Sequence, residues 1–373
     1  MKIVYNAFGG RYCDNPRALY EELVARAPDH EHLWTAAPAY RQGFPAGVRT
    51  VPYGSDACIE ALESADYVVS NDHLPLDWKK RSGTVFLQTW HGTPLKRIHH
   101  DVRWAPEGRL ERLDEDVATW NHLLSPNRAS TERLRTAFGF SGELHETGYP
   151  RNDLLSSPRQ ATVRAEVRDQ LGIAEGTTAV LYTPTWRDDQ VFAADQPDFT
   201  LQLDLDDFAR RLGRDHVLLL RVHSMVADRL AVPAGAPVVD VSNFPDVRDL
   251  YAAADVLITD YSSTMFDFAV TGRPIVYFTY DLENYRDQLR GFYFDLAEVA
   301  PGPLLRTSAD VVDALLDLDQ VTASHRDAYA AFRQAFCHLE DGHATDRVID
   351  RIFPDLTGAT HPKPPQGGQY DQR

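Results

Sequence analysis

Short apolar runs rich in β-branched residues recur along this chain, and an amphipathic stretch separates each run from the next. Such runs predict buried strands, and the stretches between them predict helices. Strands that alternate with helices form parallel sheets with helices on both faces, so the chain is predicted to have an α/β fold. The predicted strands are Lys2 to Tyr5, Tyr67 to Ser70, Val85 to Gln88, Ala179 to Tyr182, Val217 to Val222, Val256 to Thr259 and Ile275 to Phe278.

The predicted strands fall into two groups, which indicates two domains. A chain of 373 residues is long for one domain and allows each half its own core. The stretch from Ser156 to Arg159 has the composition of a turn and precedes a predicted helix from Ala161 to Leu171. We therefore place the boundary there, with residues 1–155 in the first domain and 156–336 in the second.

The end of the chain changes character. The segment from Phe332 to Phe353 has helical spacing that is interrupted at Asp341 and Gly342. From position 357 to 373 the chain is rich in Pro, Gly and Gln and has almost nothing apolar to bury, so this tail is predicted to be disordered.

Composition and charge exclude several classes of function. The net charge of −17 argues against nucleic acid as a partner, because phosphate backbones are held mainly by clustered Lys and Arg. The three cysteines are widely separated, so neither a disulfide framework nor a zinc knuckle is indicated. No apolar run reaches the ~18 residues of a membrane span, and no signal peptide is recognisable. We expect a cytoplasmic protein.

The most informative segment runs from Val256 to Ala269. A buried strand leads through Asp260 and a short polar turn into a helix, so Ser262, Ser263 and Thr264 are predicted at the helix N-terminus. Free N–H groups and the helix dipole favour an anion there, although simple capping by hydroxyls is the alternative. Asp267, about one turn further, is a candidate acceptor of ribose hydroxyls from a nucleotide donor.

Two further segments of the second half are candidates for donor binding. Arg221 and His223 are expected at the end of a buried strand, where ligands of parallel sheets bind, and either could instead be structural. Trp186 and Arg187 follow another strand and could contact a substrate or pack between the domains.

In the first half, the strand from Val85 to Gln88 is followed by the polar exit Thr89-Trp90-His91-Gly92-Thr93. Gly92 allows close backbone approach, and His91 is expected on the wall opposite the phosphate site. A histidine in that place suits a general base near neutral pH, with a hydrogen-bonded loop histidine as the alternative.

A basic and aromatic stretch follows in this acidic protein. It contains Lys96, Arg97, Arg103 and Trp104, and it predicts either a membrane-surface or polymer-binding patch or a solvated helix face. Asp204 and Asp206 resemble a metal-binding pair, but they lie where a helix is expected to begin, and carboxylates are common there. No metal and no cofactor are therefore predicted.

These segments together resemble the CDP-glycerol glycerophosphotransferase family of teichoic-acid primases and polymerases. The match runs in order along nearly the whole chain, although Arg97 to His100 departs from the pattern expected after Leu95-Lys96. It rests on Gly10 to Tyr12 with Asp14 to Pro16, Gln88 to Lys96, Gly148 to Asp153, Tyr182 to Asp188, Leu257 to Phe268, Gly272 to Pro274, Tyr280 to Leu282 with Tyr285, and Arg290 to Asp295.

The resemblance implies a GT-B architecture, in which two Rossmann-like domains face a central cleft and a C-terminal helix, here within 337–356, crosses back to the first domain. It implies that the two essential histidines of the family are His91 and His223 and that Ser262 and Ser263 bind phosphate. The acceptor is then expected near Gly92, Thr93, Lys96 and Arg97.

The implied reaction is transfer of a polyol phosphate, with glycerol phosphate favoured, from a CDP-polyol to a hydroxyl of a teichoic-acid-like or capsular polymer or its primer. CMP is released. The implied acceptor is lipid-linked or polymeric, which predicts a peripheral place at the inner face of the cell membrane. Two alternatives stay open: a GT-B glycosyltransferase or epimerase that uses a nucleotide sugar, and a non-catalytic nucleotide-binding component of envelope assembly.

Overall fold

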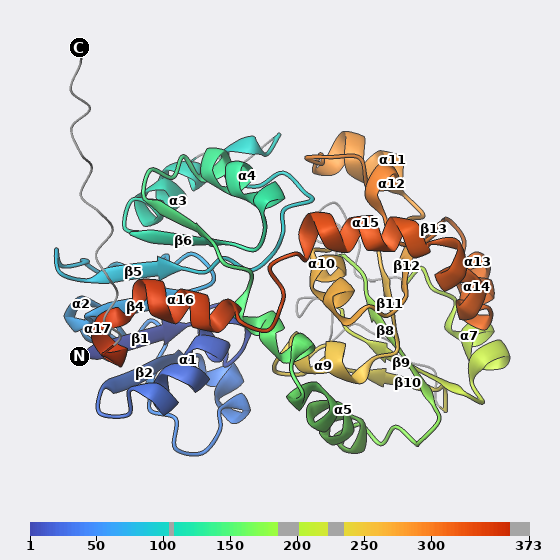
Figure 1. Cartoon of the computed structure of the whole chain (residues 1–373), viewed down its shortest axis with the longest axis horizontal. Helices are drawn as coiled ribbons and strands as arrows, with labels where there is room; N and C mark the ends of the chain where they lie inside the picture. The colour runs from blue at the N-terminus through green and yellow to red at the C-terminus, as the bar shows by residue number, and fades with distance from the viewer. Residues whose placement is uncertain (104–107, 186–200, 223–234, 359–373) are drawn as a thin grey trace, which may run out of the picture.

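The computed structural model describes residues 1–103, 108–185, 201–222 and 235–358, and it forms two lobes (Figure 1). Each lobe is built around one sheet in which every pair of neighbouring strands is parallel. The first sheet has the order β3-β2-β1-β4-β5-β6-β7. Its strands are β1 (Lys2–Asn6), β2 (Glu31–Ala36), β3 (Thr50–Pro52), β4 (Tyr67–Ser70), β5 (Val85–Gln88), β6 (His122–Ser125) and β7 (Glu143–Glu146).

The second sheet has the order β10-β9-β8-β11-β12-β13. Its strands are β8 (Thr178–Thr183), β9 (His216–Leu220), β10 (Val238–Asp240), β11 (Val256–Thr259), β12 (Ile275–Phe278) and β13 (Leu304–Leu305). The predicted domain boundary at residues 155 and 156 falls in the connection between β7 and β8. The α/β fold class is confirmed.

Helices cover both faces of each sheet (Figure 1). Those of the first lobe are α1 (Asp14–Arg26), α2 (Asp56–Ser64), α3 (Arg109–Val117), α4 (Arg128–Phe138), α16 (Ala344–Ile352) and α17 (Pro354–Thr357). Those of the second lobe are α5 (Arg159–Gln170), α7 (Leu205–Leu212), α9 (Val247–Ala253), α10 (Thr264–Phe268), α11 (Leu282–Asn284), α12 (Leu296–Val299), α13 (Ser308–Leu316), α14 (Leu318–Ser324) and α15 (Arg326–Phe336). Short 3₁₀ or π turns are η1 (Pro38–Gly43), η2 (His99–Asp101), η3 (Pro150–Ser156), η4 (Ala269–Thr271) and η5 (Tyr285–Leu289).

The C-terminal segment crosses from one lobe to the other. Phe332 and Phe336 of α15 are buried in the core of the second lobe, where their rings pack against Phe266. Val348 and Ile352 of α16 are buried instead in the core of the first lobe, as Figure 1 shows by the position of α16 beside α1. This crossing agrees with the expected architecture.

Most predicted elements have the expected position. Four of the predicted strands have the bounds of β4, β5, β11 and β12, and the others differ by one or two residues at an end. The expected helix start near Asp206 is α7, and the Asp204 carboxylate caps it by accepting a hydrogen bond of 2.9 Å from the Asp207 N–H. Of the predicted disordered tail, Thr357 ends α17, and residues 359–373 lie outside the described part.

Within the described residues, no helix combines the length and the apolar character that crossing a membrane requires.

Candidate active site

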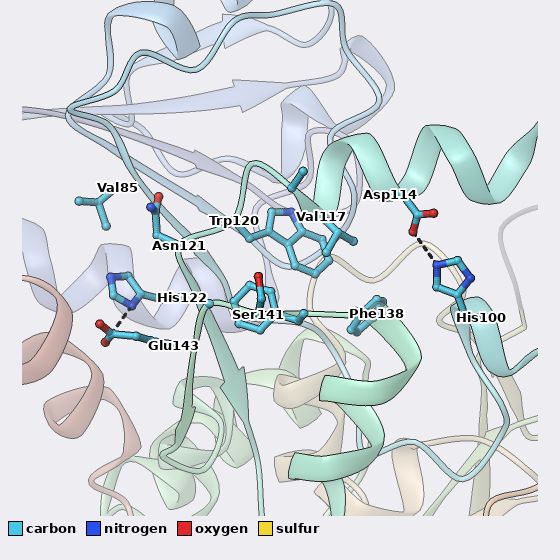
Figure 2. Close-up of a pocket in the computed structure, with 14 residues that line it drawn as sticks. Val85, His100, Asp114, Val117, Trp120, Asn121, His122, Phe138, Ser141 and Glu143 are labelled. Atoms are coloured by element: carbon cyan, nitrogen blue, oxygen red, sulfur yellow. Dashed lines mark hydrogen bonds and ion pairs between the residues drawn. The ribbon is translucent and has the colours of Figure 1, made fainter.

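A cavity of about 760 Å³ opens on the first lobe beside β6 and the end of α4 (Figure 2). Among the residues that the structure describes, none of those predicted to be catalytic or to bind substrate lines it. The predicted residues near His91 and Arg221 follow the carboxyl ends of strands, and the turn from Asp260 to Thr264 follows β11, where the strand order of the second sheet reverses. Ligands of open parallel sheets bind at such points.

The His91 ring lies at the reversal point of the first sheet, between β1 and β4. Phe8, which follows β1, packs edge-on against the ring with centroids 5.1 Å apart. The carbonyl of Asn71, which follows β4, lies 2.6 Å from His91 Nδ1. A carbonyl can only accept, so Nδ1 carries the hydrogen and neutral His91 has its lone pair on Nε2. That tautomer can take up a proton at Nε2.

The backbone around His91 is held by three side chains. The Asn15 amide donates to the Trp90 carbonyl at 3.0 Å, and Arg151 Nη1 donates to the His91 carbonyl at 3.0 Å. The Gly92 N–H donates to the Tyr149 hydroxyl at 3.2 Å. Trp90 is fixed at a φ of 53°, a left-handed conformation that a non-glycine residue adopts only when its surroundings enforce it.

The opposite wall is the turn between β11 and α10, at the reversal point of the second sheet. The Asp260 carboxylate accepts the N–H of Thr185 at 3.0 and 3.1 Å and the N–H of Tyr261 at 2.6 Å. The Thr264 hydroxyl lies 3.0 Å from that of Thr183, and the Thr264 N–H donates to Ser262 Oγ at 3.3 Å. Asp260 therefore fixes the turn by hydrogen bonds to the backbone of Thr185 and Tyr261.

The two walls meet at Gly92 and Ser263. A Cβ built on Gly92 would lie only 2.6 Å from Ser263 Oγ, which is closer than real Cβ contacts. Glycine is therefore required at position 92 for this approach of the lobes. The pairing of a histidine loop with a hydroxyl-rich turn across a cleft, predicted from the sequence, is present in the structure.

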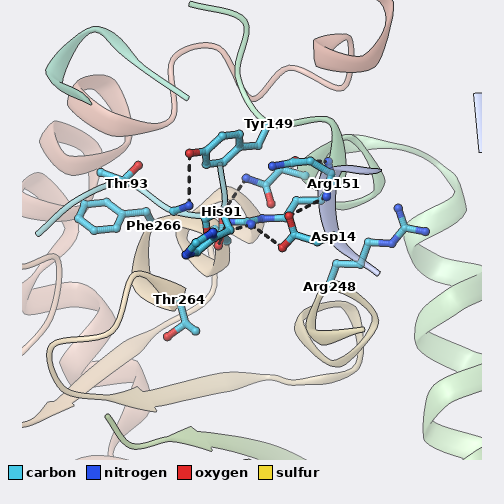
Figure 3. Close-up of polar contacts among 12 residues, drawn as sticks. Asp14, His91, Thr93, Tyr149, Arg151, Arg248, Thr264 and Phe266 are labelled. Carbon is cyan, nitrogen blue, oxygen red and sulfur yellow. Dashed lines mark hydrogen bonds and ion pairs between the residues drawn. The ribbon is translucent and has the colours of Figure 1, made fainter. Parts of the chain in front are cut away.

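A buried ion network joins the two walls, and its central residue is Arg151, which was not predicted from the sequence to be a functional residue (Figure 3). Arg151 donates to Asp14 Oδ2 at 2.6 Å and to Asp267 Oδ2 at 2.7 Å. Burial opposes its charge, but the two carboxylates outweigh burial and raise the pKa of Arg151. The signal that could have identified the network was Asp14 and Arg151 within the conspicuous Asp14-to-Pro16 and Gly148-to-Asp153 segments.

Asp267 requires a correction. Its second carboxylate oxygen accepts from the Asn152 amide at 2.9 Å, and the side chain is only 7% exposed. Both oxygens are thus used between the lobes, so the prediction that Asp267 binds a donor ribose is wrong. A carboxylate one turn into a helix faces whatever packs there, and here that is η3.

Two other predicted contacts also have structural partners. Arg221 Nη1 donates to the carbonyls of Val241 and Phe244, at 3.0 and 2.9 Å, and burial lowers the pKa of Arg221. Arg221 therefore holds the segment after β10, and these hydrogen bonds direct its guanidinium to that segment instead of to a diphosphate. Thr93 is 3% exposed, and its hydroxyl accepts from the Asn127 amide at 3.1 Å, so its assignment to the acceptor is corrected to a structural one.

The basic stretch after His91 is an extended strap and not a helix face. Lys96 forms an antiparallel bridge with Phe292, and the Arg97 N–H donates to the Gly291 carbonyl at 3.1 Å. Arg97 and Arg103 are exposed, and Arg97 lies 5.6 Å from the centre of the Tyr293 ring. The strap is a second connection between the lobes. Trp104, Trp186, Arg187 and His223 lie outside the described residues.

Known proteins resemble this chain over most of its length. It is 37% identical over 364 residues to a teichoic acid glycerol-phosphate transferase of Staphylococcus aureus, covering 94% of this chain and 92% of the relative. It is 36% identical over 362 residues to a teichoic acid poly(glycerol phosphate) polymerase of Bacillus subtilis, covering 94% of this chain and 48% of the relative. The chain thus spans about half the length of that polymerase.

A solved structure of the wall teichoic acid polymerase TagF is also similar. Its TM-score is 0.88 at 34% identity, and the match covers 96% of this chain and 89% of that one. The expected GT-B arrangement is thereby confirmed. Residues 1–354 match the family described as CDP-glycerol:poly(glycerophosphate) glycerophosphotransferase. The chain belongs to this family.

Proposed function

We propose that this protein transfers glycerol phosphate from CDP-glycerol to a hydroxyl of a teichoic-acid-type acceptor and releases CMP. Membership of the family and the likeness to glycerol-phosphate transferases support the choice of donor and acceptor. The observation that carries the proposal is the position of His91. Its Nδ1–H is held by the Asn71 carbonyl, and its loop touches Ser263 across the cleft.

His91 Nε2 acts as the general base. It takes the proton from an acceptor hydroxyl as that oxygen attacks the phosphorus that bears the glycerol. A new P–O bond forms, and the P–O bond to CMP breaks, so CMP leaves with the electron pair. The fixed tautomer helps this step, because the Nδ1–H···O bond keeps the lone pair on Nε2 directed outward.

Ser262 and Ser263 contribute hydroxyl donors to the diphosphate, and His223 is the second histidine of the family pattern. Phosphoryl transfer depends mainly on alignment and on stabilising charge at the oxygens, so donors that converge on the diphosphate are the main protein contribution. Trp186 and Arg187 are proposed to contribute to donor binding, because they directly follow Thr185 in the sequence and the Thr185 N–H donates to Asp260 of this wall.

A release assay for CMP across donors tests the proposal. CDP-glycerol, CDP-ribitol and UDP- or GDP-sugars would each be incubated with a glycerophosphate-type acceptor. We expect acceptor-dependent CMP release with CDP-glycerol and much less turnover with the others. Turnover of a nucleotide sugar in place of CDP-polyols would favour a glycosyltransferase or an epimerase, and turnover of no donor would favour a binding component.

The place of action is a proposal as well. A lipid-linked acceptor would lie at the inner face of the membrane, and the net charge of −17 opposes binding to anionic lipid. Attachment must then be local. The exposed cations Arg97 and Arg103 on the strap, beside the cleft, are suited to it, together with Lys96 and Trp104.

A further inference from the structure

We propose that His122, Glu143 and His145 form a binding site for one divalent transition-metal ion of the zinc type. The site lies on the outer strands β6 and β7 of the first sheet, away from the cleft that contains His91. Figure 2 shows His122 and Glu143 side by side at one end of the cavity. The sequence predicted no metal, so this proposal departs from that prediction.

The register of the two strands assembles the three side chains. His122 of β6 pairs with Glu143 of β7. Since side chains alternate between the faces of a strand, Glu143 and His145 point to the same face, toward His122. Three ligand atoms are thus gathered from only two neighbouring strands, with no flexible loop between them.

The distances suit coordination. His122 Nδ1 lies 3.0 Å from His145 Nε2, and Glu143 Oε2 lies 3.6 Å from the first and 3.7 Å from the second. Ligand atoms bound tetrahedrally at ~2.0–2.1 Å are about 3.3 Å apart, so a small shift of each side chain would place all three around one ion. The carboxylate is the only charged group of the three and favours a cation, although the cations of Lys80, near His122, and Arg351, near His145, act against it.

The donor set selects the kind of ion. Two imidazole nitrogens and one carboxylate oxygen favour Zn²⁺, Co²⁺ or Ni²⁺ over Mg²⁺ and Ca²⁺, which prefer oxygen ligands. The side chains of His122 and His145 are 20% and 7% exposed, whereas that of Glu143 is 74% exposed. The histidines therefore supply a fixed pair, and the carboxylate can close over the ion. The remaining position faces water.

Proton balance does not oppose binding. In the metal-free protein one ring donates an N–H to the other across the 3.0 Å contact. When the ion binds, that hydrogen moves to the second nitrogen of the same ring, so both histidines stay neutral and both facing nitrogens become ligands. One N–H···N hydrogen bond is exchanged for two coordinate bonds and one carboxylate contact.

A second group is made of His99, His100 and Asp114, and its His100 and Asp114 line the other side of the same cavity. There His100 Nε2 lies 2.7 Å from Asp114 Oδ1, and His99 Nε2 lies 3.8 Å from it. This geometry is that of a hydrogen-bonded pair with a more distant third group. It is the less regular of the two, and it provides a matched control.

The test uses tag-free full chain treated with EDTA and then dialysed. Calorimetric titration with Zn²⁺, and separately with Mg²⁺, measures stoichiometry and affinity, and the visible spectrum of Co²⁺ reports nitrogen ligands. We expect one Zn²⁺ per chain, no comparable heat with Mg²⁺, and a rise in Tm that grows with Zn²⁺ concentration, because the ion binds the folded chain.

Three variants assign the ligands. His122→Gln and His145→Asn should each weaken Zn²⁺ binding by about 100-fold or more, and the exposed Glu143→Gln by about tenfold. His100→Asn should leave the affinity unchanged. If His145→Asn fails to fold, Glu143→Gln and His122→Gln still decide. Absence of a 1:1 Zn²⁺ site in wild type, equal affinity in wild type and His122→Gln, or loss of the site in His100→Asn would overturn the proposal.

Discussion

The two walls of the cleft are held in different ways. The His91 wall is fixed by side chains from elsewhere in the chain, since Asn15, Tyr149 and Arg151 each bond to one peptide of the loop. The Ser262–Thr264 wall is fixed mainly from within its own lobe, through Asp260 and the Thr183 hydroxyl. The first wall is tied to the other lobe, because Arg151 also binds Asp267 of the second lobe, whereas these bonds of the second wall lie within the second lobe.

This difference fits the proposed roles. A general base must be held in one orientation and one tautomer, and that requires an enclosing network. A diphosphate site needs several hydroxyl and N–H donors that remain available to the ligand. We therefore expect substitutions at the first wall to affect rate and folding, and substitutions at the second to affect donor affinity.

The largest effect is expected at the base. His91→Ala should lower the rate of transfer by about 10²- to 10⁴-fold, because the proton acceptor is removed, and donor affinity should stay within a few-fold. Steady-state kinetics and donor titration on the same samples measure this. His343→Ala, which removes an exposed histidine, is the control. A rate within tenfold of wild type would show that His91 is only a loop histidine.

Arg151→Met tests whether the first wall depends on the buried network. Removing this cation leaves Asp14 and Asp267 buried without a partner, so the free energy of unfolding should fall by about 3–5 kcal/mol. Urea unfolding measures the change. The exposed ion pair of Arg49 provides the control, and Arg49→Met should have almost no effect. Equal stability of the two variants would contradict a buried network.

Glu340 gives the first wall a pH dependence. Its carboxyl accepts the Tyr149 N–H, and burial, with Asp267 nearby, raises the pKa of Glu340 from 4.5 to about 8. Because the pKa of Glu340 is higher in the folded chain than in the unfolded chain, its protonation favours the folded state. This contribution to the free energy of unfolding is complete below pH 4.5 and is lost as the pH rises toward 8.

Glu340→Gln should therefore flatten the stability curve, by on the order of 3 kcal/mol between pH 5 and pH 8.5. Urea unfolding at several pH values would reveal it. A wild type and variant with parallel curves would mean that the Glu340 carboxyl has an ordinary pKa.

Substitutions at the second wall should weaken the binding of the donor. Ser263→Ala and His223→Ala should each weaken binding of CDP-glycerol and of CMP by about tenfold, because contacts to phosphate are lost in ground and transition states alike. Calorimetry decides this, with Ser324→Ala in α14 as the control. Unchanged affinity in both variants would show that the diphosphate binds elsewhere than at this turn.

The smallest effect concerns the strap that joins the walls. Each cation near an anionic surface contributes about 1 kcal/mol, and salt weakens the attraction. Lys96→Glu/Arg97→Glu should therefore reduce co-sedimentation with anionic liposomes at low salt, and wild type should lose binding at high salt. If wild type and variant sediment equally, the strap does not contact the membrane.

The parts of this molecule that local sequence determines were predictable. β4, β5, β11 and β12 are short apolar runs rich in β-branched residues, and each was located from that local pattern. Six strands were not predicted, namely β2, β3, β6, β7, β10 and β13. The sequence of β7, for example, is Glu-Leu-His-Glu, and a strand at a sheet edge can be largely polar. His91 and Ser263 were likewise recognisable as candidates, because each lies in the polar turn that follows a buried strand.

What could not be predicted arises from pairs of residues far apart in the sequence. Asp14 and Arg151 are 137 positions apart, and only the packing of the lobes brings them together. The same packing occupies Asp267 and turns the strap around Lys96 into a partner of Phe292. The chemistry of these side chains suggested that they bind substrate. In the folded chain they contact other residues of the protein instead.

The most direct measurement of the central claim is the stoichiometry of transfer. Wild-type protein would be given CDP-glycerol labelled in the glycerol, with and without an acceptor that carries a terminal glycerol phosphate. We expect one label to be incorporated for each CMP released. Both should be abolished without acceptor and reduced at least 100-fold in His91→Ala. Release of CMP without incorporation, or incorporation that persists in His91→Ala, would contradict it.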